Sequence, residues 1–305
     1  MTRDGGRREA SRRGGTALRT ALAVAALLAA AFGARALLAP DAGPPAERPG
    51  PLLTVATWNM CGVRQWNCEA TGDTAAKRKA LEELTAGGDG ARVLLLQEVC
   101  AADLEAVRAR LGATWHAEFR AYTWRAASGR VTTVRCDGPG GGEAGYAVLS
   151  AYPLEAARVV RSPQPAVGVQ RGLLCADVPA HDVQVCTAHL TVPGGDTAHP
   201  GREYRDDQLQ ALFAAQDGRR AVFGGDLNVA PPGARDPASW VWPAAARAYR
   251  ECDRAASAAG GRPTHVSGHK LDHLFSGLPL AGCEVSDTGA SDHRALLMTV
   301  RTGGD

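Results

Sequence analysis

Short apolar runs that stop at polar residues recur along this chain of 305 residues. The run LLTVATW is followed by an asparagine, and the run VLLL is followed by a glutamine and a glutamate. Runs of this length, bounded by turn residues, predict buried strands. We expect strands at residues 52–58, 93–96, 146–150, 157–161, 171–178, 183–190, 221–226 and 271–275, and in the apolar second half of residues 291–298.

Three other segments have apolar residues three and four positions apart, which predicts helices. They are residues 74–86, 101–111 and 203–216. Thr74 is the expected N-terminal cap of the first helix, because a threonine hydroxyl can accept a hydrogen bond from the first turn. Strands outnumber helices and the two types mix along the chain, so both contribute to one fold.

The N-terminal segment differs from the rest. Residues 1–19 contain six arginines, and a weakly polar to apolar run follows up to Ala34. This layout predicts a signal peptide over residues 1–38, with an uncleaved N-terminal membrane anchor as the alternative. Residues 39–51 are rich in Pro, Ala and Gly and predict a linker. The remaining residues, 52–302, form the expected functional domain of a secreted, extracellular protein.

Charge is distributed unevenly between these parts. Before Gly50 there are eight arginines against four acidic residues, whereas the rest of the chain has 26 Lys and Arg against 28 Asp and Glu. The body therefore has no bulk positive charge to attract nucleic acid. Any such binding must depend on a local patch.

Eight cysteines all follow the leader, and an even number in an exported chain predicts disulfides. If Val178 pairs with Val183 in a hairpin, Cys175 lies directly opposite Cys186, close enough to bridge. Zinc is a weaker alternative, because no two cysteines have CxxC spacing. The other candidate pairs are Cys61–Cys68, which would close a short loop, and Cys100–Cys136 and Cys252–Cys283, which follow only by elimination.

The segment AVFGGDLNVA at residues 221–230 is the strongest single candidate for a site. Gly224 and Gly225 allow close approach of the backbone, and Asp226 and Asn228 would point to the same side of a continuing strand. A carboxylate and an amide leaving a buried strand are costly to bury without partners. A β-turn is the alternative, since Gly, Asp and Asn are common there as well.

Polar residues at the other strand ends strengthen this candidate. A single such residue is usually a turn or a cap, but six apolar runs with this ending are hard to explain in that way. Carboxylates and amides gathered at strand ends suit Mg²⁺, Mn²⁺ or Ca²⁺, and histidines suit proton transfer or phosphate contact. The set comprises Asn59, Glu98, His189, Asp226, Asn228, Asp272, Asp292 and His293.

The order of these motifs resembles the endonuclease/exonuclease/phosphatase superfamily, whose members have the DNase I-like fold. The matching segments are TWN at 57–59, QEV at 97–99, TAHL at 187–190, GDLN at 225–228, LDH at 271–273 and SDH at 291–293. The resemblance spans about residues 52–300. It implies an α+β fold, a four-layer α/β/β/α sandwich of two mixed β-sheets flanked by helices.

The resemblance also implies a role for each residue. Glu98 would be the main metal ligand, with Asn59 beside it and Asp292 nearby, and Mg²⁺ is the cation most expected, with Mn²⁺ and Ca²⁺ as alternatives. Asp226 would position or deprotonate the attacking water. The remaining roles are phosphate contact by Asn228 and His189, phosphate contact and proton transfer by His293, orientation of His293 by Asp272, and orientation of polar groups, with phosphate contact, by Arg171.

The function that follows is a secreted, metal-dependent phosphodiesterase, most simply a nuclease acting on DNA or RNA. A sphingomyelinase-like lipid phosphodiesterase is the second interpretation, with Trp66, Trp240 and Trp242 as candidates for membrane contact. Packing on the core is the alternative for these side chains. A phosphomonoesterase and a non-catalytic binding module are further alternatives. No oligomerisation signal or obligate protein partner is evident, so we expect a monomer.

Overall fold

The computed structural model describes residues 51–68, 71–136, 141–216, 218–232, 237–254 and 261–303. The chain divides into two compact units, Met1–Arg48 and Pro49–Asp305, and all described residues belong to the second. The expected signal peptide or anchor at 1–38 and the linker up to residue 50 lie outside them. Among the described residues, no helix is long and apolar enough to cross a membrane.

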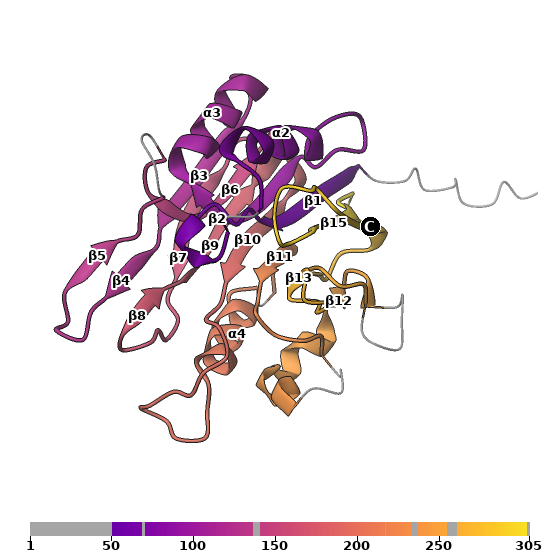
Figure 1. The fold of residues 1–305 in the computed structure, drawn as a ribbon. Coiled ribbons are helices and arrows are strands. Elements are labelled where there is room, and N and C mark those ends of the chain that lie inside the picture. The colour runs from indigo at the N-terminus through magenta and orange to yellow at the C-terminus, as the bar shows by residue number, and fades with distance from the viewer. Residues whose placement is uncertain are drawn as a thin grey trace, which may run out of the picture. The chain divides into compact units, whose positions relative to one another are not determined.

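Two six-stranded sheets form the centre of this unit (Figure 1). Their strand orders are β14-β15-β1-β2-β6-β3 and β12-β13-β11-β10-β9-β7. The first contains β14 (Leu280–Ser286), β15 (Ala295–Arg301), β1 (Leu52–Asn59), β2 (Val93–Cys100), β6 (Ala144–Ser150) and β3 (His116–Ala121). The second contains β12 (Arg250–Glu251), β13 (Asp272–Ser276), β11 (Ala221–Asp226), β10 (Val183–His189), β9 (Gly172–Val178) and β7 (Glu155–Val160).

The two sheets have the same pairing pattern. The central pairs β1–β2 and β11–β10 are parallel, and every other neighbouring pair is antiparallel. Because parallel strands run in the same direction, the carboxyl ends of both members of each central pair lie at one edge of their sheet. Each sheet therefore presents two strand ends side by side.

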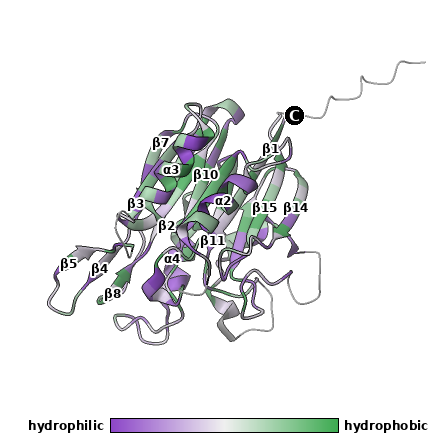
Figure 2. Ribbon diagram, turned by 45° about the horizontal axis from the view of Figure 1, so that its top comes forward, coloured by the Kyte–Doolittle hydropathy of each residue, from purple (hydrophilic) through white to green (hydrophobic). Residues whose placement is uncertain are grey.

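Alternation along the strands builds three cores and hence four layers. Val55 in β1 faces the opposite sheet, whereas Ala56 and Trp58 face α2 (Thr74–Leu84) and α3 (Ala101–Leu111). On the second sheet, Phe223 faces α4 (Tyr204–Ala214) and the short turns η3 (Pro237–Val241) and η4 (Ala244–Ala248). Hydrophobic residues follow the strands, and hydrophilic residues are prominent on α2, α3 and α4 (Figure 2). This is the α/β/β/α sandwich expected from the sequence.

A third, smaller sheet has the order β5-β4-β8. Its strands are β4 (Thr123–Arg125), β5 (Val131–Thr133) and β8 (Gly168–Gln170), and it projects at the lower left of Figure 1. Sequence analysis did not predict these strands, nor β3, β12 and β14. Their residues are mainly half-buried or exposed, so they contain no apolar run that would mark them.

The three expected helices and all the expected strands are present, with small shifts at their ends. One detail was wrong: the N-terminal cap of α2 is Asp73 and not Thr74. The Asp73 carboxylate accepts a hydrogen bond of 2.8 Å from the backbone N–H of Ala76. The two residues are adjacent, and the sequence pattern alone does not separate them.

Four disulfides cross-link the described residues. β9 and β10 pair Val178 with Val183, which places Cys175 opposite Cys186 as the register predicts. The other bonds are Cys61–Cys68, Cys100–Cys136 and Cys252–Cys283, in agreement with the expected pairs. Cys175–Cys186 joins two neighbouring strands of the second sheet, and each of the other three bonds includes a loop residue.

Candidate active site

The carboxyl ends of the two parallel strand pairs meet between the sheets. β1 ends at Asn59, and β10 and β11 end with the paired residues His189 and Asp226. The Asn59 Nδ2 atom lies 3.1 Å from Asp226 Oδ2 and 3.3 Å from Glu98 Oε1. One amide therefore donates to a carboxylate from each sheet, and all four side chains are buried.

Behind this point, a polar contact joins the sheets directly. Gln97 Nε2 donates to Thr187 Oγ1 of the opposite sheet at 2.9 Å and to Thr57 Oγ1 at 3.1 Å. All three side chains are fully buried. Because buried hydrogen bonds in a dry core have strict geometry, this contact sets the spacing of the two sheets next to the site.

Glu98 occupies a β-bulge in β2 with a φ of 50°, which turns its side chain away from the regular alternation. No basic side chain in the described part of the chain lies within ion-pair distance of this buried carboxylate. Burial raises the pKa of Glu98 to about 7, against the opposing effect of the Asn59 hydrogen bond. A buried carboxylate beside an amide, without a cationic partner, is the donor set that a hard divalent cation requires.

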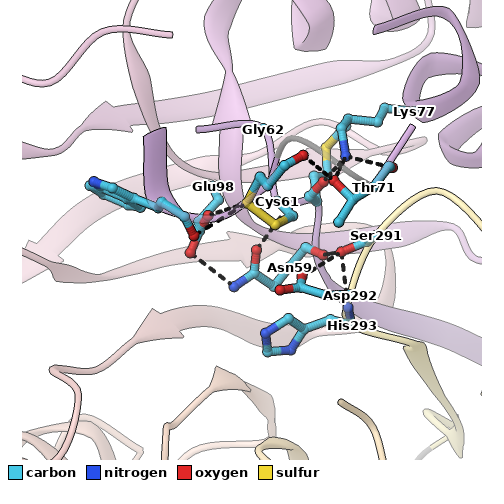
Figure 3. The surroundings of a disulfide bond; sticks show 12 residues. Asn59, Cys61, Gly62, Thr71, Lys77, Glu98, Ser291, Asp292 and His293 are labelled. Carbon is cyan, nitrogen blue, oxygen red and sulfur yellow. Dashed lines mark hydrogen bonds between the residues drawn. A yellow bond between two sulfur atoms is a disulfide. The ribbon is translucent and has the colours of Figure 1, made fainter. Parts of the chain in front are cut away.

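The loop after β1 holds Asn59 in place (Figure 3). The backbone N–H of Cys61 donates to Asn59 Oδ1 at 2.9 Å, and Sγ of Cys68, its disulfide partner, lies 3.6 Å from Glu98 Oε2. Lys77 from α2 donates to the carbonyl oxygens of Met60 at 2.9 Å and Ala290 at 2.8 Å. The loop is therefore anchored from a disulfide on one side and a buried lysine on the other.

A hydrogen bond with Tyr122 determines which ring nitrogen of His189 carries the proton. The backbone N–H of Glu98 donates to the Tyr122 hydroxyl at 3.1 Å, and this hydroxyl lies 2.7 Å from His189 Nδ1. Burial lowers the pKa of His189 well below its usual value, and nearby Arg171 adds to this effect. In the neutral ring, Nδ1 then accepts from Tyr122 and Nε2 carries the proton, 3.4 Å from Asp226 Oδ2.

His293 is cationic, whereas His189 is neutral. Its Nδ1 lies 2.8 Å from Asp272 Oδ2, and its Nε2 lies 3.8 Å from Asp226 Oδ2. Burial disfavours the imidazolium, but Asp272 and then Asp226 outweigh it and raise the pKa of His293 to about 10. The site thus presents one neutral and one cationic imidazole on the two sides of Asp226.

Asp226 and Asn228 are not on one continuing strand, so that expectation was wrong. β11 ends at Asp226, and Asn228 has a left-handed φ of 51° in the following turn. Asn228 N–H donates to Asp226 Oδ1 at 3.0 Å and its Nδ2 donates to the Leu190 carbonyl at 3.1 Å, while the Arg205 guanidinium donates to the Asn228 carbonyl. Burial raises the pKa of Asp226, against the opposing charge of His293.

The paired glycines before Asp226 serve the strands themselves. A Cβ on Gly224 would lie 1.9 Å from the His273 carbonyl oxygen, and one on Gly225 would lie 1.9 Å from that of Ala188. Both have positive φ values, 152° and 143°, which glycine adopts without strain. The close approach expected from the sequence is therefore to the neighbouring strands β13 and β10.

Two remaining candidates lie at the edge of this group. Asp292 is half-buried, and its Oδ2 lies 3.5 Å from His265 Nε2, so it clusters with His265 and His293. The Arg171 guanidinium stands over the Trp66 ring, 5.7 Å from its centroid, and its buried Nε has no hydrogen-bond partner among the described residues. It borders a hollow of about 410 Å³ together with Trp66, Val169, Thr191 and Tyr204.

Sequence reasoning missed Tyr122, Lys77 and His265. Tyr122 follows a half-buried strand that was not predicted, and Lys77 stands among the charged residues of an ordinary amphipathic helix. His265 lies in the loop that precedes β13. None of the three belongs to a recognisable motif, so only their contacts identify them.

Comparison with known proteins supports the same assignment. The sequence profile of the Endonuclease/Exonuclease/phosphatase family matches residues 56–293. No curated protein matches the sequence. The fold is similar to that of a solved endonuclease/exonuclease/phosphatase from Beutenbergia cavernae DSM 12333, with a TM-score of 0.58, 23% identity, and coverage of 83% of this chain and 72% of that one.

Two further solved structures share the fold. The human Nocturnin catalytic domain with bound sulfate anion has a TM-score of 0.59, 18% identity, and coverage of 82% of this chain and 94% of that one. TDP2 from D. rerio, complexed with single strand DNA product, has a TM-score of 0.56, 16% identity, and coverage of 81% and 98%. At these identities, the likeness concerns the fold alone.

Proposed function

The chain belongs to the Endonuclease/Exonuclease/phosphatase family, and on that premise we propose that it is a secreted, metal-dependent phosphodiesterase that cleaves DNA or RNA. Members of this family are typically hydrolases of phosphoric esters and commonly use divalent cations. The observation that supports catalysis here is the position of Asp226, between neutral His189, cationic His293 and the Asn59–Glu98 pair.

Glu98 and Asn59 would hold the cation, for which Mg²⁺ is our first candidate, with Asp292 close to it. Once bound, such a cation neutralises charge on the phosphoryl group. Among the described residues, no protein cation pairs with buried Glu98, and the Asn59 amide is the one side-chain donor to its carboxylate, which supports this assignment.

The protein's own groups would then act on water and phosphate. Asp226, with its raised pKa, would position the attacking water and accept its proton. The Nε2–H groups of His189 and His293 would donate to phosphate oxygens as negative charge develops, and His293 would also transfer a proton. Asn228 and Arg171 complete the proposed set of phosphate contacts, and Asp272 keeps the tautomer and charge of His293.

Two observations make nucleic acid the preferred substrate. The tryptophans considered for membrane contact pack mainly on the protein: Trp242 contacts Phe213 and Phe275, and Trp66 contacts Tyr122, although Trp240 is 50% exposed. TDP2, which shares the fold, has been solved with a single strand DNA product. Four disulfides fit an extracellular location.

The test is plasmid nicking by the purified full chain with Mg²⁺, with EDTA, and with the variant His293→Ala. We expect EDTA to abolish nicking and the variant to lose roughly 10²- to 10⁴-fold in rate, the usual contribution of acid–base catalysis. His116→Ala is the matched control, because His116 pairs with Ser150 at the end of the first sheet remote from Cys100 and Glu98.

Nicking that survives EDTA or the loss of His293 would contradict the proposal. If the protein hydrolyses bis(4-nitrophenyl) phosphate but does not nick the plasmid, it is a phosphodiesterase whose natural substrate is not nucleic acid. Hydrolysis of no phosphoester with Mg²⁺, Mn²⁺ or Ca²⁺ would exclude the enzyme function altogether.

A further inference from the structure

A stretch with basic but no acidic residues runs from the end of β3 through β4 and β5. Residues 119–136 contain four arginines and no aspartate or glutamate, although the body of the chain as a whole has more acidic than basic residues. Arg125, Arg130 and Arg135 are exposed, and no carboxylate among the described residues lies within ion-pair distance of them. Arg120 differs, since it pairs with Glu118 at 3.3 Å. Three unpaired cations therefore concentrate on one small element.

This element, which we call the arm, consists of β4, β5, β8, the turn between β4 and β5, and the segment that follows β5 up to Arg135, whose backbone bridges to Glu143. The arm joins the rest of the protein at the start of β4 and at the end of β8, and a site residue lies next to each of these points. β4 begins one residue after Tyr122, which contacts His189, and β8 ends one residue before Arg171. The surface of the arm therefore adjoins the proposed phosphate site.

The register of the arm places an aromatic side chain on the face that adjoins the site. Trp124 pairs with Thr132 on one side and Val169 on the other, so these three side chains share one face of the sheet. Val169 borders the 410 Å³ hollow that also contains Arg171. Trp124 is 46% exposed, and it therefore extends this face outward from the hollow.

We propose that the arm binds a nucleic-acid strand that continues from the active site and passes around the arm. Trp124 stacks on a base at the face beside the hollow, and Arg125, on the opposite face, contacts phosphates together with Arg130 and Arg135. The proposal rests on the function proposed above and specifies how a polymer is held. Guanidinium groups form strong paired hydrogen bonds with phosphate oxygens. Exposed aromatic rings bind bases of any sequence by stacking.

The distribution of residues on the arm favours nucleic acid over a lipid surface. An element that enters a membrane interface carries its large apolar side chains where it meets the lipid. The turn of the arm, residues 126–130, instead reads Ala-Ala-Ser-Gly-Arg, and the apolar Trp124 and Val131 lie behind it on the strands.

The experiment compares a polymer and a small substrate on the same protein. The arm variant combines Arg125→Gln, Arg130→Gln and Arg135→Gln. The control combines Arg219→Gln, Arg250→Gln and Arg301→Gln, which removes the same charge from strand ends remote from the site, where Arg250 pairs with Ser276 and Arg301 with Leu52. Both are assayed by kcat/KM on an oligonucleotide and on bis(4-nitrophenyl) phosphate over a salt series.

We expect the arm variant to lose roughly tenfold or more in kcat/KM on the oligonucleotide. The slope of log K for binding against log salt concentration should fall by roughly two, since each of three phosphate contacts on a single strand contributes about 0.7. Activity on the small diester should stay at the wild-type level. Binding is measured separately by fluorescence anisotropy of labelled single-stranded DNA with His293→Ala protein in EDTA, where Trp124→Ala should weaken binding roughly tenfold.

The outcomes distinguish the two proposals. If the wild type cleaves the oligonucleotide and the arm variant matches the control, the arm proposal is overturned and the nuclease remains. If the wild type hydrolyses only the small diester, the nuclease fails, and anisotropy still decides whether the arm binds DNA. Co-sedimentation with phosphatidylcholine–sphingomyelin vesicles that depends on Trp124, without DNA binding, would overturn the arm proposal in favour of a lipid surface.

Discussion

The two large sheets have the same strand pairing but contribute different chemistry to the site. The parallel pair β1–β2 supplies Asn59 and Glu98, an oxygen-rich half for which the described residues provide no basic ion-pair partner. The parallel pair β10–β11 supplies His189 and Asp226, and its neighbour β13 supplies Asp272. One topology therefore yields a half suited to a cation and a half suited to proton transfer, because the polar side chains at the carboxyl ends of the strands differ.

Each half also buries a lysine behind its strand ends, with different partners. In the first half, Lys77 contacts the carbonyl oxygens of Met60 and Ala290 and both oxygens of Thr71. In the second half, Lys270 Nζ lies 2.8 Å from Glu251 Oε1, which is also 2.7 Å from His273 Nδ1. The first lysine supports a loop through neutral groups, whereas the second belongs to a buried ionic cluster.

The largest expected effect concerns that ionic cluster. Glu251→Gln should lower the free energy of unfolding at neutral pH by about 3–5 kcal/mol, because it leaves the buried Lys270 without its carboxylate. Denaturant unfolding measures the change. Glu284→Gln, at an exposed position in β14 of the other sheet, is the matched control and should change stability by less than about 0.5 kcal/mol.

The pH dependence of this effect follows from the direction of the shift. Burial alone would raise the pKa of Glu251, but His273 and then Lys270 outweigh it and lower the pKa below its ordinary value of 4.5. The stabilisation is therefore complete above about pH 4.5 and is lost as the pH falls through the lower folded-state value. A difference between wild type and Glu251→Gln that stays constant on acidification would refute this account.

A smaller effect should separate the two halves of the site. Glu98→Gln should raise the Mn²⁺ dissociation constant roughly 10- to 100-fold, because it removes the carboxylate of the oxygen-rich half. Isothermal titration calorimetry without substrate measures it. His189→Gln, in the other half, should bind Mn²⁺ as the wild type does and lose rate at saturating metal. Equal effects of both variants on Mn²⁺ binding would abolish the division between the halves.

The smallest of these effects should come from the hydroxyl that joins the halves. Tyr122→Phe removes the link between the Glu98 N–H and His189 Nδ1 and leaves two buried polar atoms without partners, at a cost of about 1–3 kcal/mol. We expect roughly tenfold lower kcat with Mn²⁺ affinity unchanged. Tyr146→Phe, a buried neighbour whose ring stacks on Tyr122, is the control. If Tyr122→Phe lowers Mn²⁺ affinity and leaves kcat unchanged, Tyr122 supports only the half of the site that contains Asn59 and Glu98.

Some of this protein could be predicted from its sequence because the relevant signals are local. Apolar runs predicted the buried strands, and the short turn between two of them gave the hairpin register that places Cys175 opposite Cys186. Polar residues directly after those runs identified Asn59, Glu98, His189 and Asp226, since a strand delivers its last side chain to the edge of a sheet. The burial of a strand and the alternation of its side chains can both be recognised from a short run of residues, without knowledge of the partner strand.

The tertiary structure decided what depends on residues distant in sequence. It turned Asn228 out of the strand into a left-handed position, brought Tyr122 between Glu98 and His189, and assigned His265 to Asp292. It also formed the half-buried strands of the arm, which pair segments some forty residues apart. Such contacts arise from the packing of two sheets, where the position of each polar atom is set by partners that no local pattern specifies.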